Sequence, residues 1–487
     1  MKKLLYILLA IPCWLIAENT DNLLRIRHTD GTITDSRTQD IREIRFMREA
    51  DKEIMRISNK DGDETTYAAS EVHDAVLMDV IERIKYDTVI TKVRRHKVTD
   101  TISVDSTLVD GYVDDPDKNG RVVLIYVPYW AKQLPNPNYA THIAYSCAHI
   151  YMPNGVYSGF QLVNDTTGKV LKQCIALKQK NPNLKVLLSF FDAGKSSEYY
   201  TGYGFSSLAA SDTYRKQFAA DCLAFCQKWG IDGVDIDWEV PTNNFNGLPD
   251  SPADKDNFRK MMKQLRTTLG ADRLVTYASY VMADKYSDDT GSAPYVDFIN
   301  VMYYDAFEAP RPHNAMYNGG NSTTGGYWDI YKTYDSFHNA GFPMHKFVLG
   351  VPFYGHHKSG NDSELYYSQI LIRLKANPAV WTSRYNSIWQ VPVLYKNDTI
   401  WCSYDDPSSI TNKGNYAVQK GMGGLMAWQS DGDDGGKNLQ KAMWHSQRCK
   451  PSKVWQYTYN TISYMSDHDT VITPIVIRDT VLHVIKR

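Results

Sequence analysis

The chain has no excess of charge of either sign. Its 487 residues include 54 lysines and arginines against 55 aspartates and glutamates, a formal net charge of −1. A protein without a strong positive field has no long-range attraction for nucleic acid or for an anionic membrane surface. We therefore expect no nucleic acid among its partners.

Cysteine is scarce as well. After Cys13, six cysteines are scattered between positions 147 and 449. This spacing excludes a dense disulfide framework, and Cys222 and Cys226 lack the second half of a zinc motif. The pattern favours buried free thiols, with no metal site.

Long apolar runs are almost absent. One runs from Leu4 to Ile16, behind Lys2 and Lys3 and before Ala17, and it is too short to span a bilayer. This arrangement is typical of a secretory signal peptide over residues 1–17. We expect a protein without a membrane span that is secreted, periplasmic or at the cell surface. Cys13 leaves lipid attachment as an open alternative.

Aromatic residues, in contrast, are abundant, with 34 tyrosines and 11 tryptophans. Their flat, amphipathic rings suit both core packing and stacking on sugars.

An internal repeat begins the ordered part of the sequence. The segment from Leu23 can be laid over the segment from Ile54, an offset of 54 − 23 = 31 residues. Each copy carries an Asp-Gly pair, at 30–31 and 61–62, between alternating segments, which predicts a hairpin. Because one hairpin alone cannot bury a core, the two copies predict a small β-rich repeat module over 18–80, acting as a spacer or attachment.

Two further segments flank the main body of the chain. Residues 81–120 include an acidic stretch with little apolar content, which predicts a linker. Residues 450–487 contain an alternating β-branched run, which predicts a short C-terminal β tail.

Between 121 and 449, short apolar runs alternate with helical stretches, a pattern typical of a parallel sheet with helical crossovers. Eight candidate strands can be counted, at 121–129, 140–148, 185–191, 233–239, 274–280, 297–305, 346–354 and 423–429. Eight such units predict an α/β fold, a (β/α)8 TIM barrel, in which the chemistry lies at the C-terminal ends of the strands.

The strongest chemical signal is the segment DGVDIDWE at 232–239. On a strand, Asp235, Asp237 and Glu239 face one way and the apolar residues between them face the other. In a barrel the apolar set suits the helix layer, so the carboxylates point inward. Three anions about 6 to 7 Å apart in a low dielectric cannot all stay ionised, so we expect a protonated carboxyl. Glu239, nearest the mouth, is the natural general acid.

The same segment resembles the signature DxxDxDxE of the family 18 glycoside hydrolases, the chitinases and endo-β-N-acetylglucosaminidases. Further similarities follow in the family's order, at 302–305 (MYYD), 350–355 (GVPFYG) and 423–429 (GGLMAWQ). The resemblance covers about 121–447.

It implies a retaining mechanism in which the substrate's own acetamido group is the nucleophile. Glu239 would protonate the leaving oxygen, Asp237 would orient the acetamide, Asp235 would share a proton or hydrogen bond behind it, and Tyr304 would donate to the acetamido carbonyl.

The resemblance also implies a set of substrate-binding residues. Asp305 would hydrogen-bond the distorted sugar and Trp428 would form an apolar floor beneath it. Asp232, Met302 and Tyr354 complete the set. No metal or cofactor enters this scheme.

Two departures from the family pattern stand out. Strand three ends in SFFD (189–192) where many members have SxGG, which places bulk near the sugar site. The segment between strands seven and eight, 355–422, is short for the α+β insertion that walls a deep groove, so we expect an open cleft.

Three functions fit these observations. The first is hydrolysis of β-1,4-linked N-acetylglucosamine in chitin-type oligosaccharides or polysaccharides. The second is an endo-β-N-acetylglucosaminidase that cuts the chitobiose core of N-glycans with the same site. The third is a non-catalytic chitin-binding lectin, which the presence of Glu239 argues against.

Overall fold

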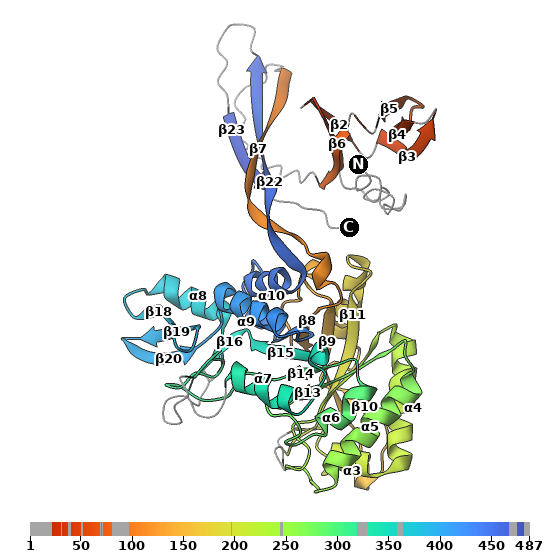
Figure 1. Ribbon diagram of the computed structural model, residues 1–487, viewed down its shortest axis with the longest axis vertical. Helices are drawn as coiled ribbons and strands as arrows, with labels where there is room; N and C mark the ends of the chain where they lie inside the picture. The colour runs from red at the N-terminus through yellow and green to blue at the C-terminus, as the bar shows by residue number, and fades with distance from the viewer. Residues whose placement is uncertain are drawn as a thin grey trace, which may run out of the picture. The chain divides into compact units, whose positions relative to one another are not determined.

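The computed structural model (Figure 1) describes residues 22–79 except 31, 38–39, 50–51, 69 and 71; residues 97–466 except 196, 244–246, 319–328 and 358–363; and residues 475–481. The chain divides into two compact units. One contains 1–111 and 453–487, and the other contains 112–452.

The larger unit is a closed barrel, as the alternating pattern predicted. Eight parallel strands pair in the order β9-β11-β12-β13-β14-β15-β21-β8, and a β8–β9 pairing closes the ring. They are β8 (Val122–Pro128), β9 (His142–Ile150), β11 (Lys185–Phe191), β12 (Gly233–Asp237), β13 (Leu274–Ser279), β14 (Phe298–Val301), β15 (Phe347–Pro352) and β21 (Gly424–Trp428). A short strand, β10 (Phe160–Leu162), adds antiparallel to β9. Each of the eight coincides with a predicted strand.

Helices surround these strands in Figure 1. They are α2 (Lys169–Ala176), α3 (Phe205–Ala210), α4 (Asp212–Trp229), α5 (Asp254–Leu269), α6 (Asp289–Ser292), α7 (Ile330–Asn339), α8 (Tyr367–Ala376), α9 (Pro407–Gln419) and α10 (Asn438–Arg448). Within the described residues, every helix is too short or too polar to span a bilayer.

Helix α4 shows how local sequence sets these boundaries. The Ser211 hydroxyl accepts a hydrogen bond from the Tyr214 amide and caps the start of the helix. Gly230, with φ of 67°, ends it in the left-handed region that favours glycine. Cys222 and Cys226 lie on its buried face as free thiols, which confirms their predicted packing role.

The segment between β15 and β21 differs from the prediction. It contains β16 (Tyr354–His356) paired with β17 (Glu364–Tyr366), helix α8, and an antiparallel sheet of β18 (Trp381–Asn386), β19 (Val391–Lys396) and β20 (Thr399–Ser403). The expectation that this segment was too short for an α+β insertion is therefore wrong. Tight hairpins let a complete small sheet fit into few residues.

The N-terminal repeats form two three-stranded sheets, and each sheet contains strands from both repeats. Their strands are β1 (Asn22–His28), β2 (Ile33–Arg37) and β3 (Ile41–Glu49) from the first repeat, and β4 (Lys52–Asn59), β5 (Glu64–Ala68) and β6 (Val72–Asp79) from the second. The two predicted hairpins are present as β1–β2 and β4–β5, which turn between His28 and Ile33 and between Asn59 and Glu64. The third strand of each repeat, however, pairs with the other repeat, giving sheets β2-β1-β6 and β3-β4-β5.

The strand pairing between the two repeats has the same register in both sheets. Ile26 pairs with Ala75 in one sheet, and Ile57 pairs with Ile44 in the other. Adding the 31-residue offset converts one pair into the other, since 26 + 31 = 57 and 44 + 31 = 75. The buried side chains of both repeats, Ile26, Ile41, Met55 and Ile57, form one cluster. Two copies therefore build one core, as expected.

A third sheet contains β7 (Lys97–Asp114), β22 (Cys449–Ser466) and β23 (Ile475–Val481), in the order β23-β22-β7. The C-terminal β tail is thus present. The linker predicted over 81–120 is wrong for 97–114, because its alternating Val, Ile and Thr residues suit a paired strand. Residues 81–96 lie outside the described part of the chain.

Closure of the barrel depends on Gly424. A Cβ at this position would lie 2.1 Å from the carbonyl oxygen of Val122 in the neighbouring strand. We expect Gly424→Ala to lower the free energy of unfolding of the barrel by about 1–3 kcal/mol or more, as overpacking does. Thermal unfolding followed by circular dichroism measures the loss. Gly435→Ala is the control, because a Cβ there would have no neighbour within 4 Å; equal melting temperatures for the two variants would contradict the prediction.

Candidate active site

The predicted row of carboxylates points into the barrel. Asp235 and Asp237 lie on β12 and are buried, and Glu239 follows just beyond the end of the strand, partly exposed. The alternating residues Val234, Ile236 and Trp238 belong to the core between the strands and the helices. The row therefore runs from the barrel interior to its C-terminal mouth.

Asp235 sits at the base of the row, fully buried, and accepts four hydrogen bonds from four other strands. Its Oδ2 accepts from the hydroxyls of Tyr126 on β8, at 2.7 Å, and Ser189 on β11, at 2.8 Å. Its Oδ1 accepts from Thr276 on β13, at 2.6 Å, and from the Asn300 amide on β14, at 3.1 Å. Burial raises the pKa of Asp235, while these four bonds oppose that rise by stabilising the carboxylate.

Asp237 and Glu239 form a hydrogen-bonded pair above this base. Burial, followed by the charges of Glu239 and Asp235, raises the pKa of Asp237 well above its ordinary value. Burial also raises the pKa of Glu239, to about 7, although its bond to Asp237 acts in the opposite direction. The pair therefore holds a proton near neutral pH, in line with the protonated carboxyl that the carboxylate row predicted.

One oxygen of this pair has no partner. Oδ1 of Asp237 is buried and receives no hydrogen bond within the described part of the chain. A buried polar atom of this kind is costly unless a group such as an amide N–H meets it.

Tyr304, Met302 and Trp428 gather at the mouth of the barrel. All three are partly buried and pack on the apolar cluster that fills the barrel interior. Burial, and then the charges of Asp237 and Glu239, raise the pKa of the Tyr304 phenol well above its ordinary value, so it stays a hydrogen-bond donor. These three residues lie where the prediction placed them.

Asp305, after β14, also lies at this mouth. Its side chain is 43% exposed, and its Oδ1 accepts a hydrogen bond from the Tyr354 hydroxyl at 2.8 Å. Tyr354 is itself buried and its hydroxyl holds Asp305, so its contact with substrate stays a prediction.

Asp232 is a second correction. It precedes β12, so it lies at the opposite end of the strand from Glu239, about 16 Å below Asp237 at 3.3 Å per residue. Its carboxylate pairs with Lys178 at 2.7 Å and Lys185 at 3.4 Å. It ties strand and helix together at the base of the barrel and cannot bind a substrate at the mouth.

A group that could share a metal ion includes Asp305, His313 and His356, whose donor atoms lie within 4.8 Å of one another. Both histidines already hydrogen-bond Asp305. Nδ1 of His356 lies 2.8 Å from Oδ1 of Asp305, and Nδ1 of His313 accepts from the Asp305 backbone amide at 3.3 Å. We therefore interpret the group as a hydrogen-bonded cluster and not as a set of metal ligands.

Sequence reasoning missed the donors to Asp235, namely Tyr126, Ser189, Thr276 and Asn300. A signal existed for three of them. Ser189, Thr276 and Asn300 are polar residues within largely apolar buried strands, and such residues need a partner.

The SFFD segment ends β11 next to the site. Asp192 is buried and accepts a hydrogen bond from the Phe205 amide at 3.1 Å. Burial raises its pKa to about 7. Phe191 lies opposite Asp237 in the strand register, so bulk does border the carboxylate row, as predicted.

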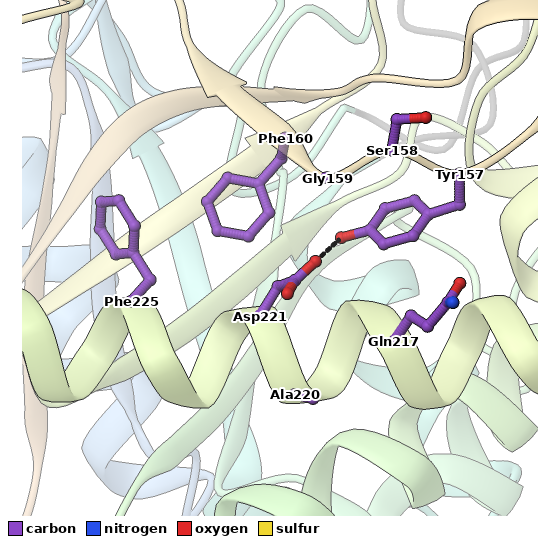
Figure 2. Close-up of a pocket in the computed structure, with 8 residues that line it drawn as sticks. All are labelled: Tyr157, Ser158, Gly159, Phe160, Gln217, Ala220, Asp221 and Phe225. Carbon is purple, nitrogen blue, oxygen red and sulfur yellow. Dashed lines mark hydrogen bonds between the residues drawn. The ribbon is translucent and has the colours of Figure 1, made fainter.

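A separate cavity of about 590 Å³ lies between α4 and the segment that leads into β10. Figure 2 shows Phe160 and Phe225 along its wall and the Tyr157 hydroxyl donating to Asp221 at 2.9 Å. None of the predicted site residues lines it. The cavity is therefore distinct from the carboxylate row.

The barrel and its acidic row can now be compared with known proteins. The model of the family "Glycosyl hydrolases family 18" matches residues 122–433, which spans every barrel strand from β8 to β21. The chain belongs to glycosyl hydrolase family 18.

Among family relatives, chitinase A1 of Niallia circulans is 29% identical over 367 residues, covering 63% of this chain and 51% of that protein. The chain thus spans about half the length of this relative. A solved family 18 N-acetylglucosaminidase from Paenibacillus barengoltzii is 25% identical with a TM-score of 0.55, covering 67% of this chain and 99% of that one. The group IV chitinase of Ostrinia furnacalis shares the fold, with a TM-score of 0.59 at 24% identity, covering 67% and 99%.

The bond from Tyr126 to Asp235 offers a test of the buried base. We expect Tyr126→Phe to lower the free energy of unfolding by about 1–3 kcal/mol, because it leaves a buried charged acceptor short of a donor. Tyr303→Phe is the control, since the Tyr303 hydroxyl donates to a neutral carbonyl, that of Ala315. Urea unfolding at pH 7 measures both, and an equal loss in the two variants would contradict the prediction.

Proposed function

We propose that the chain is an exported hydrolase of β-1,4-linked N-acetylglucosamine, acting on chitin-type oligosaccharides. The observation that carries this proposal is the unpartnered Oδ1 of Asp237 beside the protonated Glu239. A 2-acetamido sugar brings an amide N–H to that oxygen and a glycosidic oxygen to the acid. A sugar with a 2-hydroxyl group would carry no amide carbonyl to act as a nucleophile.

The residues divide the reaction between them. Glu239 gives its proton to the glycosidic oxygen as the bond to the anomeric carbon breaks. The acetamido carbonyl oxygen attacks that carbon from the opposite face and forms an oxazolinium ion. Asp237 accepts the acetamide N–H and stabilises the positive charge. Water then attacks the anomeric carbon, gives a proton back to Glu239, and releases the sugar with its configuration retained.

The other site residues position the substrate. Tyr304 donates to the acetamido carbonyl, Trp428 supplies the apolar floor under the sugar, and Asp305 hydrogen-bonds its hydroxyls. Asp235, held by four donors, keeps a negative charge beneath Asp237, which favours the proton on the upper pair.

Two further observations support a chitin-type substrate and export. The relative from Niallia circulans is named as a chitinase. The structure also contains an α+β insertion after β15, which the sequence analysis did not expect. In the family resemblance such an insertion goes with a deep groove, and a deep groove would favour long chains over a glycan core. Export rests on the signal-peptide pattern of residues 1–17.

Substrate and catalysis can be tested together. We expect the purified chain to cleave chitotetraose, and Glu239→Gln to reduce kcat by about 10²- to 10⁴-fold, the usual contribution of a general acid. Chromatography of the products measures cleavage. Glu198→Gln, on the loop after β11, is a control outside the row.

A high-mannose glycoprotein is assayed in parallel. Release of its glycan without cleavage of chitotetraose would favour the endo-β-N-acetylglucosaminidase. Binding of chitotetraose with no cleavage of either substrate would favour the lectin.

The pH profile follows from Glu239. Because burial raises its pKa to about 7, the acid is protonated below this pH and loses its proton above it. We expect kcat to be level between pH 5 and 6.5 and to fall about tenfold per pH unit well above 7. Asp305→Asn should move this fall to lower pH, because the Asp305 charge raises the pKa of Glu239. A fall that begins near pH 4.5 would contradict the assignment.

A further inference from the structure

The Asp305 carboxylate is held from one side only. Its Oδ1 accepts from the Tyr354 hydroxyl and lies 2.8 Å from Nδ1 of His356. Its Oδ2 receives no hydrogen bond from any residue that the structure describes. The anchored oxygen therefore fixes the direction in which the other faces the cleft. Any change in the anchor changes the orientation of a group that binds substrate.

His313 cannot serve as the cationic part of this anchor. It is fully buried, its Nδ1 accepts a hydrogen bond from the Asp305 backbone amide, and burial lowers its pKa. A ring nitrogen that accepts an N–H carries no proton of its own. His313 is therefore neutral and holds the backbone of Asp305, which has a φ of 54°.

His356 is different in position and in charge. Its side chain is 21% exposed, so solvent protons reach it, and it lies directly across from Glu364 in the β16–β17 pair. The ionisable groups that face it are Asp305, Glu308 and His313 from the segment after β14, and Glu364 from β17. Three of these four are acids, and the fourth is the neutral His313.

We propose that His356 is a positioning residue whose protonated imidazole fixes the Asp305 carboxylate for substrate binding, so that affinity for N-acetylglucosamine chains falls when the imidazole loses its proton. This inference rests on the proposed function. A hydrogen bond between two charged groups is about twice as strong as its neutral counterpart. A neutral imidazole leaves Asp305 less firmly held.

The sign of the effect follows from the surroundings of His356. The hydrogen bond to Asp305 raises the pKa of the imidazole; burial opposes this, and the charges of Asp305, Glu364 and Glu308 add to the rise. His356 is therefore charged below its usual pKa of about 6.5 and somewhat above it. The anchor is at full strength in acid and weakens as the pH rises past the raised pKa.

This titration is separable from that of Glu239. Glu239 acts while the bond breaks, so its ionisation is expressed in kcat. His356 acts through Asp305 on binding, so its ionisation is expressed in KM. The two groups predict different pH profiles for the two constants.

The test compares KM for chitotetraose between pH 5.5 and 8.5 in three chains. For the wild type we expect KM to rise about 5- to 10-fold over this range, the difference between a charged and a neutral hydrogen bond. His356→Gln, which is never charged, should have the raised KM at every pH. His356→Arg, which is always charged, should keep the low KM at every pH.

His357→Gln is the matched control. His357 is the next residue, but its Nδ1 faces the Trp401 carbonyl and not Asp305. Its variant should keep the wild-type rise of KM with pH, and all four chains should share the fall of kcat. Thermal unfolding verifies that each variant is folded.

A KM that rises with pH in His356→Gln as it does in the wild type would overturn the inference. A second measurement needs no His356 variant: calorimetric binding of chitotetraose to the Glu239→Gln chain should weaken 5- to 10-fold from pH 5.5 to 8.5, and equal affinity would overturn the inference as well. Failure of the wild type to cleave any substrate at any pH would instead overturn the proposed function, and this inference with it.

Discussion

A carboxylate buried inside a closed barrel is the constraint on which the rest of the site depends. Asp235 can remain there as an anion only because four polar side chains from β8, β11, β13 and β14 donate to it. These bonds also fix the relative positions of the four strands. The charge then acts on its neighbours along β12. Burial and the charge of Glu239, with the Asp235 charge added to them, make Asp237 harder to ionise, and the Asp237–Glu239 pair retains a proton that exposed carboxyls would lose.

The mouth of the barrel thus contains acids of two kinds. Burial and a neighbouring anion keep Glu239 protonated near neutral pH, while the polar groups around Asp305 outweigh its burial and keep its pKa below the ordinary value. The side-chain chemistry of the two residues is nearly the same. Their surroundings decide that one can release a proton and the other can only accept hydrogen bonds.

The fold was largely predictable because each barrel strand is a local apolar run, and the motif at 232–239 indicated the acidic row. The donors to Asp235 were not, because they lie between 41 and 109 residues from it in sequence and meet it only when the barrel closes. Asp232 shows the limit of a motif. The motif contains Asp232 but does not show at which end of the strand this residue lies. In the structure Asp232 precedes β12, far from Glu239.

The β7 strand shows a related limit. Its acidic composition suggested an unstructured linker, but its strand partner, β22, begins more than 300 residues later in the chain, where local composition gives no hint of it. A strand pairing between residues so far apart in the sequence depends on the whole fold and cannot be predicted from the local sequence of either strand.

The exchanged strands of the N-terminal repeats carry a consequence for how that module gains and loses structure. Because β6 completes the sheet of β1 and β3 completes the sheet of β4, neither 31-residue copy contains all the neighbours that its own hairpin requires. A copy that came loose would open an edge in both sheets at once. The two repeats therefore form one folding unit, and deletion of either repeat would unfold the other.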